Sequence, residues 1–228
     1  MTSPTVGAFD AVKDHDGSNI RKVLQMAVFL APWETATAME SLVDVTNKVS
    51  IPAGYLSVGI LNKESALTTT PSISVSEVPG YGYGQTLRRD ITSRNLSVAF
   101  TMIESRRRAF EVYYGIDLSS VKATTAASGK NELVIDEPDR PDTLYWRMLV
   151  LGADGDGANT IYLADFYPKV TLSEAQAIAN SETDPRQYAV TMGADLDTAV
   201  GTAHRQFFAG PGLTTARIEA MDFSRATA

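Results

Sequence analysis

The chain has 228 residues, 44% of them apolar, which is enough for a hydrophobic core in one large domain or two small ones. It contains no cysteine, so disulfides, thiolate metal sites and cysteine nucleophiles are excluded. The N-terminus lacks the basic-then-apolar layout of a signal peptide, and no apolar run approaches a membrane span, so we expect a soluble protein used without export and without a membrane partner.

The net charge of −7 is unevenly distributed. Residues 1–130 carry 13 basic and 12 acidic side chains, whereas residues 131–228 carry 7 basic and 15 acidic ones. Residues 88–108 hold six arginines against two acids, Asp90 and Glu104. Two interpretations remain open: each patch is a solvated face, or the basic segment meets an acidic surface on its own chain or on a second copy.

The first quarter of the chain predicts an arm followed by strands. Residues 1–20 are polar and form an arm or loose terminus. Residues 23–30 alternate in polarity, which predicts a strand ended by Pro32. Residues 34–44 fit either a short helix or part of a long loop, and residues 55–61 predict a second strand. The inward side chains of this second strand are Leu56, Val58 and Ile60.

Three further strands are predicted over residues 72–78, 85–91 and 95–103, with PGYGYG at 79–84 as a loop. The first has Ile73 and Val75 on one face. Its opposite face carries Ser72, Ser74 and Ser76. The last has an apolar face and a small polar face that contains Ser97, Ala99 and Thr101.

The period then changes from two to 3.6, which predicts one helix over residues 104–114. Its apolar stripe contains Ile103, Phe110, Tyr113 and Tyr114, and Gly115 stands where a helix-ending glycine belongs.

The rest of the chain returns to β structure after a turn-rich connection at residues 122–131. Strands are predicted over 132–135, 144–151, 159–166, 188–192 and 204–208, with a hairpin turn at 154–159 and breaks at Pro168, Pro185 and Pro211. No repeat or separable linker is present. We therefore predict a single domain over 1–228, with an N-terminal arm (1–20) and a C-terminal extension (209–228). Its fold class is mainly β, a sandwich or barrel with one packed α-helix.

Catalytic patterns are sparse, and the sequence predicts no enzyme, no metal site and no cofactor. His15 and His204 are assigned structural or solvent roles, and Asp154 and Asp156 fit a hairpin turn better than a calcium loop. Two alternatives from other functional classes stay open. Asp195 and Asp197 lie two apart and could act as the paired acids of a hydrolase. The arginine-rich segment could bind nucleic acid. An acidic chain, however, gains little of the affinity that basic proteins obtain by releasing counterions from the phosphate backbone.

Arginines in the first turn of a helix are unfavourable because that end is already partly positive. Glu104 can pair with one of them, and we expect the others to find carboxylates beyond residue 131, on this chain or on a second copy. The candidates for a subunit interface are Arg88, Arg89, Asp90, Arg94, Arg106, Arg107 and Arg108.

The order of several motifs resembles that of the tail tube proteins of long-tailed, siphovirus-type bacteriophages, above all those infecting actinobacteria. The motifs are GYLS (54–57), PSISVSEV (71–78), TLRRDIT (86–92), SVAFTMIE (97–104) and a helix ending in YYG (113–115). DFYPKVTLSEAQ (165–176) and YAVTMGADLD (188–197) resemble the family's C-terminal strand pair, and the likeness covers roughly residues 23–200.

This resemblance implies a structural virion protein whose fold is the family's β-sandwich or barrel. Six copies form a ring, the inner strands join into one β-barrel, and stacked rings make a hollow tail tube. Phage DNA passes through the tube into the host without specific binding. The implied partners are the chain itself and the tape measure, tail terminator and distal tail proteins, with assembly in the host cytoplasm. A tube protein of a contractile tail or secretion-like machine, which would have a sheath, is the alternative within the family.

The resemblance also implies a role for the strand faces that carry small hydroxylated side chains. Ser72, Ser74, Ser76, Ser97 and Thr101 are candidates for lining a lumen or contacting a neighbour. The competing interpretation is an ordinary solvent-exposed face.

Overall fold

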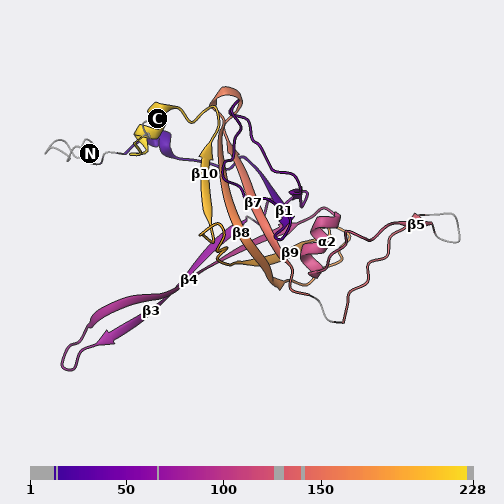
Figure 1. The fold of residues 1–228 in the computed structure, drawn as a ribbon, viewed down its shortest axis with the longest axis horizontal. Helices are drawn as coiled ribbons and strands as arrows, with labels where there is room; N and C mark the ends of the chain where they lie inside the picture. Colours follow the sequence, from indigo (N-terminus) through magenta and orange to yellow (C-terminus); the bar gives the residue numbers. More distant parts are fainter. Residues whose placement is uncertain (1–12, 14, 66, 126–130, 140–141, 225–228) are drawn as a thin grey trace.

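The computed structural model describes residues 13, 15–65, 67–125, 131–139 and 142–224. It is mainly β, as the sequence predicts. Seven strands follow one another in the antiparallel order β2-β1-β7-β8-β9-β4-β3, and β10 pairs with β8 (Figure 1). Their bounds are β1 Gln25–Pro32, β2 Leu56–Ser57, β3 Thr68–Pro79, β4 Thr86–Met102, β7 Tyr145–Asp154, β8 Ile161–Ala175, β9 Tyr188–Ala194 and β10 Arg205–Ala209. A separate two-stranded ladder joins β5 (Thr124–Thr125) to β6 (Asn131–Glu132).

Backbone hydrogen bonds close the main sheet into a barrel. β2 pairs with β1, and the residues directly after β2 pair with the end of β4. The Asn62 N–H donates to the Thr101 carbonyl at 2.9 Å, and the Ile103 N–H donates to the Ile60 carbonyl at 3.0 Å. The path through β1, β7, β8, β9 and β4 therefore returns to the segment that follows β2, and only β3 and β10 remain as side branches.

Alternate side chains of the barrel strands form the core inside the barrel, because successive residues of a strand point to opposite faces. Val28 of β1, Met148 of β7 and Met192 of β9 are completely buried there. The other members from these strands and β4 and β8 include Leu30, Val98, Phe100, Met102, Trp146, Val150, Tyr167, Val170, Tyr188 and Val190.

A second apolar cluster covers the outer face of β1, β7 and β8. Residues 33–55 contribute Met39, Leu42 and Tyr55, which pack with Leu149 and Phe166. Phe207 of β10 packs against the same cluster. Residues 34–44 thus form a long loop and not a helix. Because β7 is covered on both faces, its sequence is a nearly continuous run of apolar residues.

Two sequence-based expectations about the strands are corrected. Leu56 and Ile60 are exposed and only Val58 faces the core. Between Val58 and Ile60 the alternation is interrupted by Gly59, which takes a left-handed φ of 96°. Pro168 does not end a strand but lies inside β8, at a bulge where the pairing of Trp146 with Val170 shifts to that of Met148 with Tyr167. A bulge accepts proline because no ladder N–H is required there.

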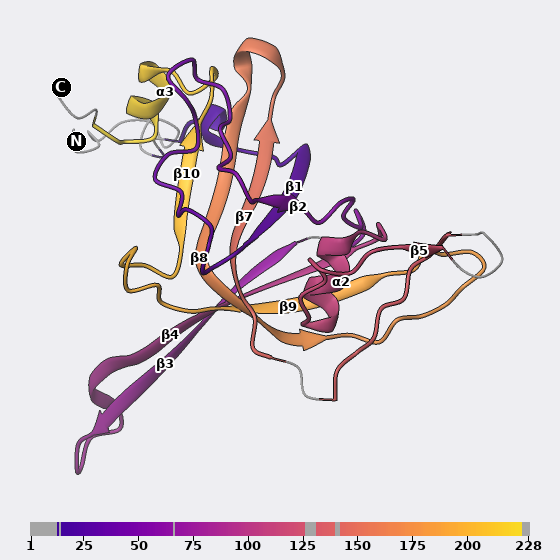
Figure 2. The same cartoon turned by 45° about the vertical axis from the view of Figure 1, so that its right-hand side comes forward.

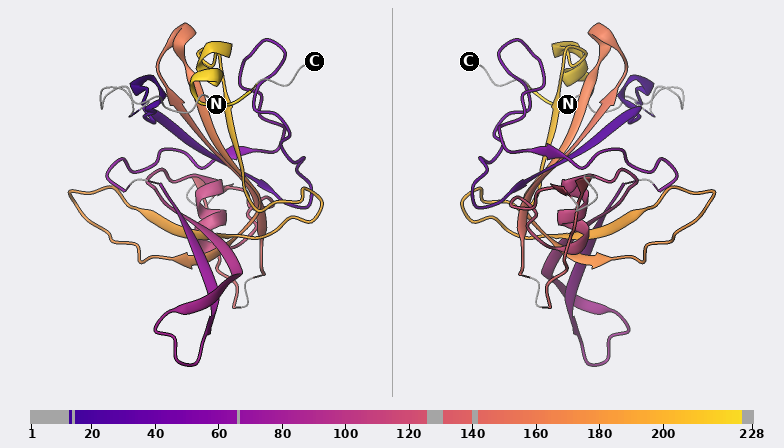
Figure 3. Two further views of the ribbon diagram at one scale, coloured as in Figure 1. Left: turned by 90° about the vertical axis from the view of Figure 1, so that its left-hand side faces the viewer. Right: turned by 90° about the vertical axis from the view of Figure 1, so that its right-hand side faces the viewer.

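The predicted helix is present as α2 (Arg107–Tyr114), ended by Gly115 in the left-handed conformation, φ 64°. Its buried side chains are Arg108, Ala109, Glu111 and Val112, while Phe110 and Tyr113 pack half-buried near Tyr188. Figure 3 shows α2 with strands of the sheet on both sides. A second short helix, α3 (Thr215–Ala220), lies in the C-terminal extension, and two single 3-10 turns occupy Gly17–Asn19 and Gly157–Asn159.

Candidate assembly interface

The hairpin formed by β3 and the outer part of β4 extends away from the barrel (Figures 1 and 2). β4 is one continuous strand of 17 residues, where the sequence predicted two. Only Leu96–Met102 pairs with β9, so residues 86–95 pair with β3 alone. β3 ends the sheet and every one of its 12 residues is exposed. Along residues 69–79 its outer edge therefore offers backbone groups that no other described strand pairs with.

The two faces of this hairpin differ in chemistry. Directly opposite residues of an antiparallel pair project to the same side. Ile73 lies opposite Arg94, Val75 opposite Ile91 and Glu77 opposite Arg89. We call this side the apolar hairpin face, defined by Ile73, Val75, Ile91, Arg94, Arg89 and Glu77. The other side, the serine face, carries Ser72, Ser74, Ser76 and Ser93, together with Asn95, Asp90, Val78 and Arg88.

The apolar hairpin face is open to solvent. Ile73, Val75 and Ile91 are 53%, 44% and 70% exposed. Monomeric proteins normally blunt long apolar edges, because such edges pair with other chains. A contiguous exposed apolar surface on an extended hairpin is typical of a surface that another molecule covers.

The basic candidates on the hairpin have local partners or none. Arg88 Nε lies 2.8 Å from Asp90 Oδ2, and Arg89 Nη2 lies 2.5 Å from Glu77 Oε1. Arg94 is exposed and forms no ion pair with any other residue that the structure describes. Exposed pairs of this kind contribute little to stability, so these arginines remain available for contacts with a neighbour.

The three arginines at the start of α2 find their carboxylates within the same segment. Arg106 pairs with Glu104, Arg107 Nε lies 3.5 Å from Glu111 Oε1, and Arg108 Nη1 lies 2.7 Å from Glu111 Oε2. The expectation that residues beyond 131 supply these partners is therefore wrong. A glutamate one turn later in the helix forms ion pairs with two arginines at once, because residues three and four apart lie on one face.

Arg108 is placed differently from its neighbours. Its side chain is buried, and its guanidinium lies 4.6 Å from the centre of the Trp146 ring. Burial lowers the pKa of Arg108 and raises the pKa of Glu111, although each charge favours the charged form of the other. Arg108 is therefore part of the packed interior of this chain, and Arg106 and Arg107 are the exposed members of the group.

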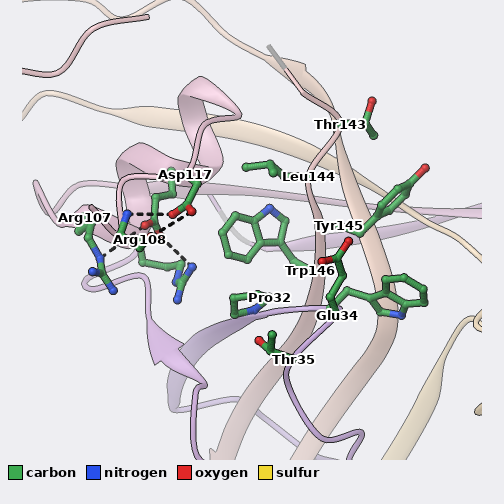
Figure 4. A pocket seen from close by; sticks show the side chains of 13 residues that line it. Pro32, Glu34, Thr35, Arg107, Arg108, Asp117, Thr143, Leu144, Tyr145 and Trp146 are labelled. Carbon is green, nitrogen blue, oxygen red and sulfur yellow. Dashed lines mark hydrogen bonds and ion pairs between the residues drawn. The ribbon is translucent and has the colours of Figure 1, made fainter. Parts of the chain in front are cut away.

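A cavity of about 410 Å³ adjoins this arginine group, between α2, the end of β1 and the start of β7. Figure 4 shows Arg107, Arg108 and Asp117 gathered on the α2 side, with Trp146 beside them. Glu34 and Glu111 also line the cavity, so its cations are matched by carboxylates. This balance does not fit a basic phosphate-binding patch at the cavity.

Asp195 and Asp197, the candidate paired acids, are not placed as a pair. Asp195 is exposed after the end of β9, whereas Asp197 is buried. Asp197 Oδ2 accepts hydrogen bonds from Trp33 Nε1 and Arg147 Nη1, both at 2.9 Å. The arrangement stabilises the fold and offers no pair of facing carboxylates. Sequence reasoning missed Arg147, whose only signal was a cation in the middle of an apolar strand.

The remaining candidates occupy ordinary structural positions. His204 Nε2 lies 2.8 Å from Asp165 Oδ1 and its ring stacks on Tyr167, while His15 is exposed. Ser72, Ser74 and Ser76 are exposed, Ser97 is half-buried and Thr101 is buried in the barrel wall. Within the described ranges, no group of three or more His, Asp or Glu side chains is arranged to hold a metal ion. The helices described here are too short and polar to cross a membrane.

No protein-family model matches the sequence, and no curated protein matches it. Among solved structures, two similar chains come from the virion of a native gene transfer agent particle and from the tail of an empty gene transfer agent particle refined with helical and C6 symmetry. Each is 9% identical to this chain with a TM-score of 0.35. The matches cover 80% of this chain, and 95% and 96% of the two other chains.

Proposed function

We propose that this chain is a self-assembling structural subunit of a phage-type tail tube and that it catalyses no reaction. One observation carries the proposal: a closed barrel bears a long hairpin whose apolar face and outer strand edge are covered by no other residue that the structure describes. Ile73, Val75 and Ile91 are the exposed apolar side chains of the apolar hairpin face.

The physical consequence of this surface is association. An uncovered strand edge pairs readily with another backbone, and the exposed apolar area adds a driving force for burial. In this proposal the hairpin of one copy contacts a different surface of the next copy. Such contacts give closed rings or open filaments, according to the rotation between neighbours.

The motif order given above supplies the form of the assembly in this proposal. Six copies make a ring, and rings stack into the hollow tube of a virion tail, whose ends meet the tape measure, tail terminator and distal tail proteins. DNA passes through the lumen without specific binding. The chain carries a net charge of −7, and an acidic lumen would repel phosphate.

Negative-stain electron microscopy of the purified full chain over a concentration series, with sedimentation velocity alongside, tests the proposal. We expect rings or hollow tubes of constant diameter that increase with concentration. A protein that stays monomeric at every concentration, including in crowded solution, would contradict self-assembly. Irregular aggregates without a constant diameter would also contradict it.

A further inference from the structure

We infer that the apolar hairpin face of one copy docks on the acidic arm of a second copy, where the acidic arm is residues 131–139. The inference rests on the proposed self-assembly and names the two surfaces that meet in it.

The hairpin side of the contact is apolar with a basic margin. Ile73, Val75 and Ile91 are exposed in its centre. Arg94 lies directly opposite Ile73 and has no ion-pair partner in the described part of the chain. Arg89 is held by Glu77 on the same face. A partner for this face needs exposed apolar side chains and carboxylates.

The acidic arm has both properties. Leu133 and Val134 are 56% and 54% exposed. Four carboxylates and no basic residue occupy residues 131–139, and all four acidic side chains are exposed: Glu132, Asp136, Glu137 and Asp139. None of them forms an ion pair with another described residue. The arm therefore complements the hairpin in charge and also brings apolar surface.

The backbone of the arm is also available. Only Asn131 and Glu132 pair with another strand, β5, and residues 133–138 belong to no helix or strand. The outer edge of β3 has no neighbour in the sheet. A segment with unpaired backbone groups can add to such an edge, with alternate side chains supplying specificity.

The two surfaces lie at opposite ends of the molecule. The hairpin points away from the barrel on one side, and β5, which pairs with the first two residues of the arm, lies on the other, in both views (Figures 1 and 2). One chain cannot bring them together. The contact is therefore heterologous, from the hairpin of one copy to the arm of the next, and it can repeat from copy to copy.

A competing apolar surface on the same chain is a less suitable partner. A groove of about 790 Å³ is lined by Val23, Leu24 and Ile60. Its charged residues are Lys63 and Asp165, which balance each other. Charge complementarity to the arginines of the hairpin favours the acidic arm.

Charge reversal in the full chain tests the contact. The hairpin variant is R89E/R94E and the arm variant is D136K/E137K, and a control, E174K/E182K, makes the same charge change as the arm variant at exposed positions elsewhere. We expect each interface variant alone to need at least tenfold more protein to assemble than the wild type. The control assembles like the wild type, and thermal melting and circular dichroism show all variants folded.

The decisive measurement mixes the two interface variants. Each then offers its partner a surface of opposite charge, so we expect the mixture to form rings or tubes near the wild-type concentration. If the wild type assembles but the arm variant assembles equally well, this inference is wrong and the proposed function stands. The same holds if the wild type assembles and the mixture of the two variants is not rescued. Wild type that never assembles overturns the proposed function, and the inference with it.

Discussion

Arg147 Nη1 lies 2.9 Å from Asp197 Oδ2, and both side chains are buried. The pair joins the middle of β7 to the segment that follows β9, and Trp33 adds a third connection through its hydrogen bond to the same carboxylate oxygen. Arg147 also donates from Nε to the Ala36 carbonyl at 3.0 Å and from Nη1 to the Pro168 carbonyl at 3.1 Å. A single arginine thus ties the outer loop, the bulge of β8 and the segment after β9 to the barrel wall.

Removing the carboxylate of Asp197 leaves a buried guanidinium without its counter-charge. We expect D197A to lower the free energy of unfolding by about 3 kcal/mol, as the loss of one partner of a buried pair typically does. D195A is the matched control, because Asp195 is exposed, and it changes stability by less than about 0.5 kcal/mol. Urea denaturation of the three proteins measures the difference. Equal stability of D197A and D195A would show that the pair is not needed.

The same carboxylate gives a pH dependence of stability. Burial alone would raise the pKa of Asp197, but hydrogen bonds from Trp33, the Ala199 N–H and Arg147 outweigh it and lower the pKa below its ordinary value. A carboxyl with a lowered folded-state pKa contributes stability above its unfolded pKa, about 3.9, and loses that contribution as the pH falls through the folded value.

We therefore expect the stability difference between wild type and D197N to be constant from pH 7 to about pH 5 and to shrink below about pH 4. Denaturation curves at a series of pH values measure it. A difference that grows on acidification contradicts the assigned direction of the pKa shift.

The sequence predicted the strands best where one face is covered. In β4 and β9 the alternating apolar side chains are those of the core, such as Val98 and Val190. Gly115 correctly marked the end of α2. These features depend on local periodicity and on backbone conformation, which a single segment contains.

The features missed by sequence analysis depend on contacts between distant segments. The buried role of Asp197 requires Arg147, 50 residues away. The closure of the barrel requires that Ile60 meets Ile103, and the bulge at Pro168 exists only against β7. α3 was missed because it is a six-residue helix without a strong apolar stripe. The hairpin was predicted as separate strands, since the bulges within its register interrupt the alternation.

Arg108 and Glu111 give a second test of buried charge. Desolvation is the main influence on both pKa values and disfavours the charged form of each. Taking two charges out of water costs more than their attraction often returns, whereas breaking such a pair leaves one charge uncompensated. We expect E111L alone to destabilise the fold by about 3 kcal/mol and R108M/E111L to lie within about 1 kcal/mol of the wild type.

A double-mutant cycle with R108M, E111L and the combination measures this coupling by thermal or chemical denaturation. Additive effects of the two substitutions would show that the pair acts as two independent residues and contradict the interpretation. R107Q is the exposed control at the same helix end and leaves stability nearly unchanged.

The closure of the barrel depends on close packing at Gly59. A Cβ atom at this position would lie 2.5 Å from Glu104 Oε2, the oxygen that accepts the Ile60 N–H at 2.9 Å. Gly54 has a similar φ of 92° but open space around it. We expect G54A to cost about 1 kcal/mol from backbone strain alone and G59A to cost about 2–4 kcal/mol from strain and crowding together. Equal losses in denaturation experiments would show that Glu104 moves freely and does not hold the closure.

Substitutions on the two faces of the hairpin are expected to affect assembly differently. I73S/V75S/I91S replaces apolar side chains that are 44–70% exposed, so we expect the melting temperature to stay within a few degrees of the wild type, as is usual for surface substitutions. Assembly is expected to weaken at least tenfold, because the area buried between copies is lost.

S72A/S74A/S76A changes the opposite face and is expected to assemble normally if that face lines an open lumen. Sedimentation velocity and electron microscopy at matched concentrations measure both variants. Normal assembly of the apolar-face variant would contradict the proposed contact. Loss of assembly only in the serine-face variant would show that neighbouring copies meet on the serine face instead.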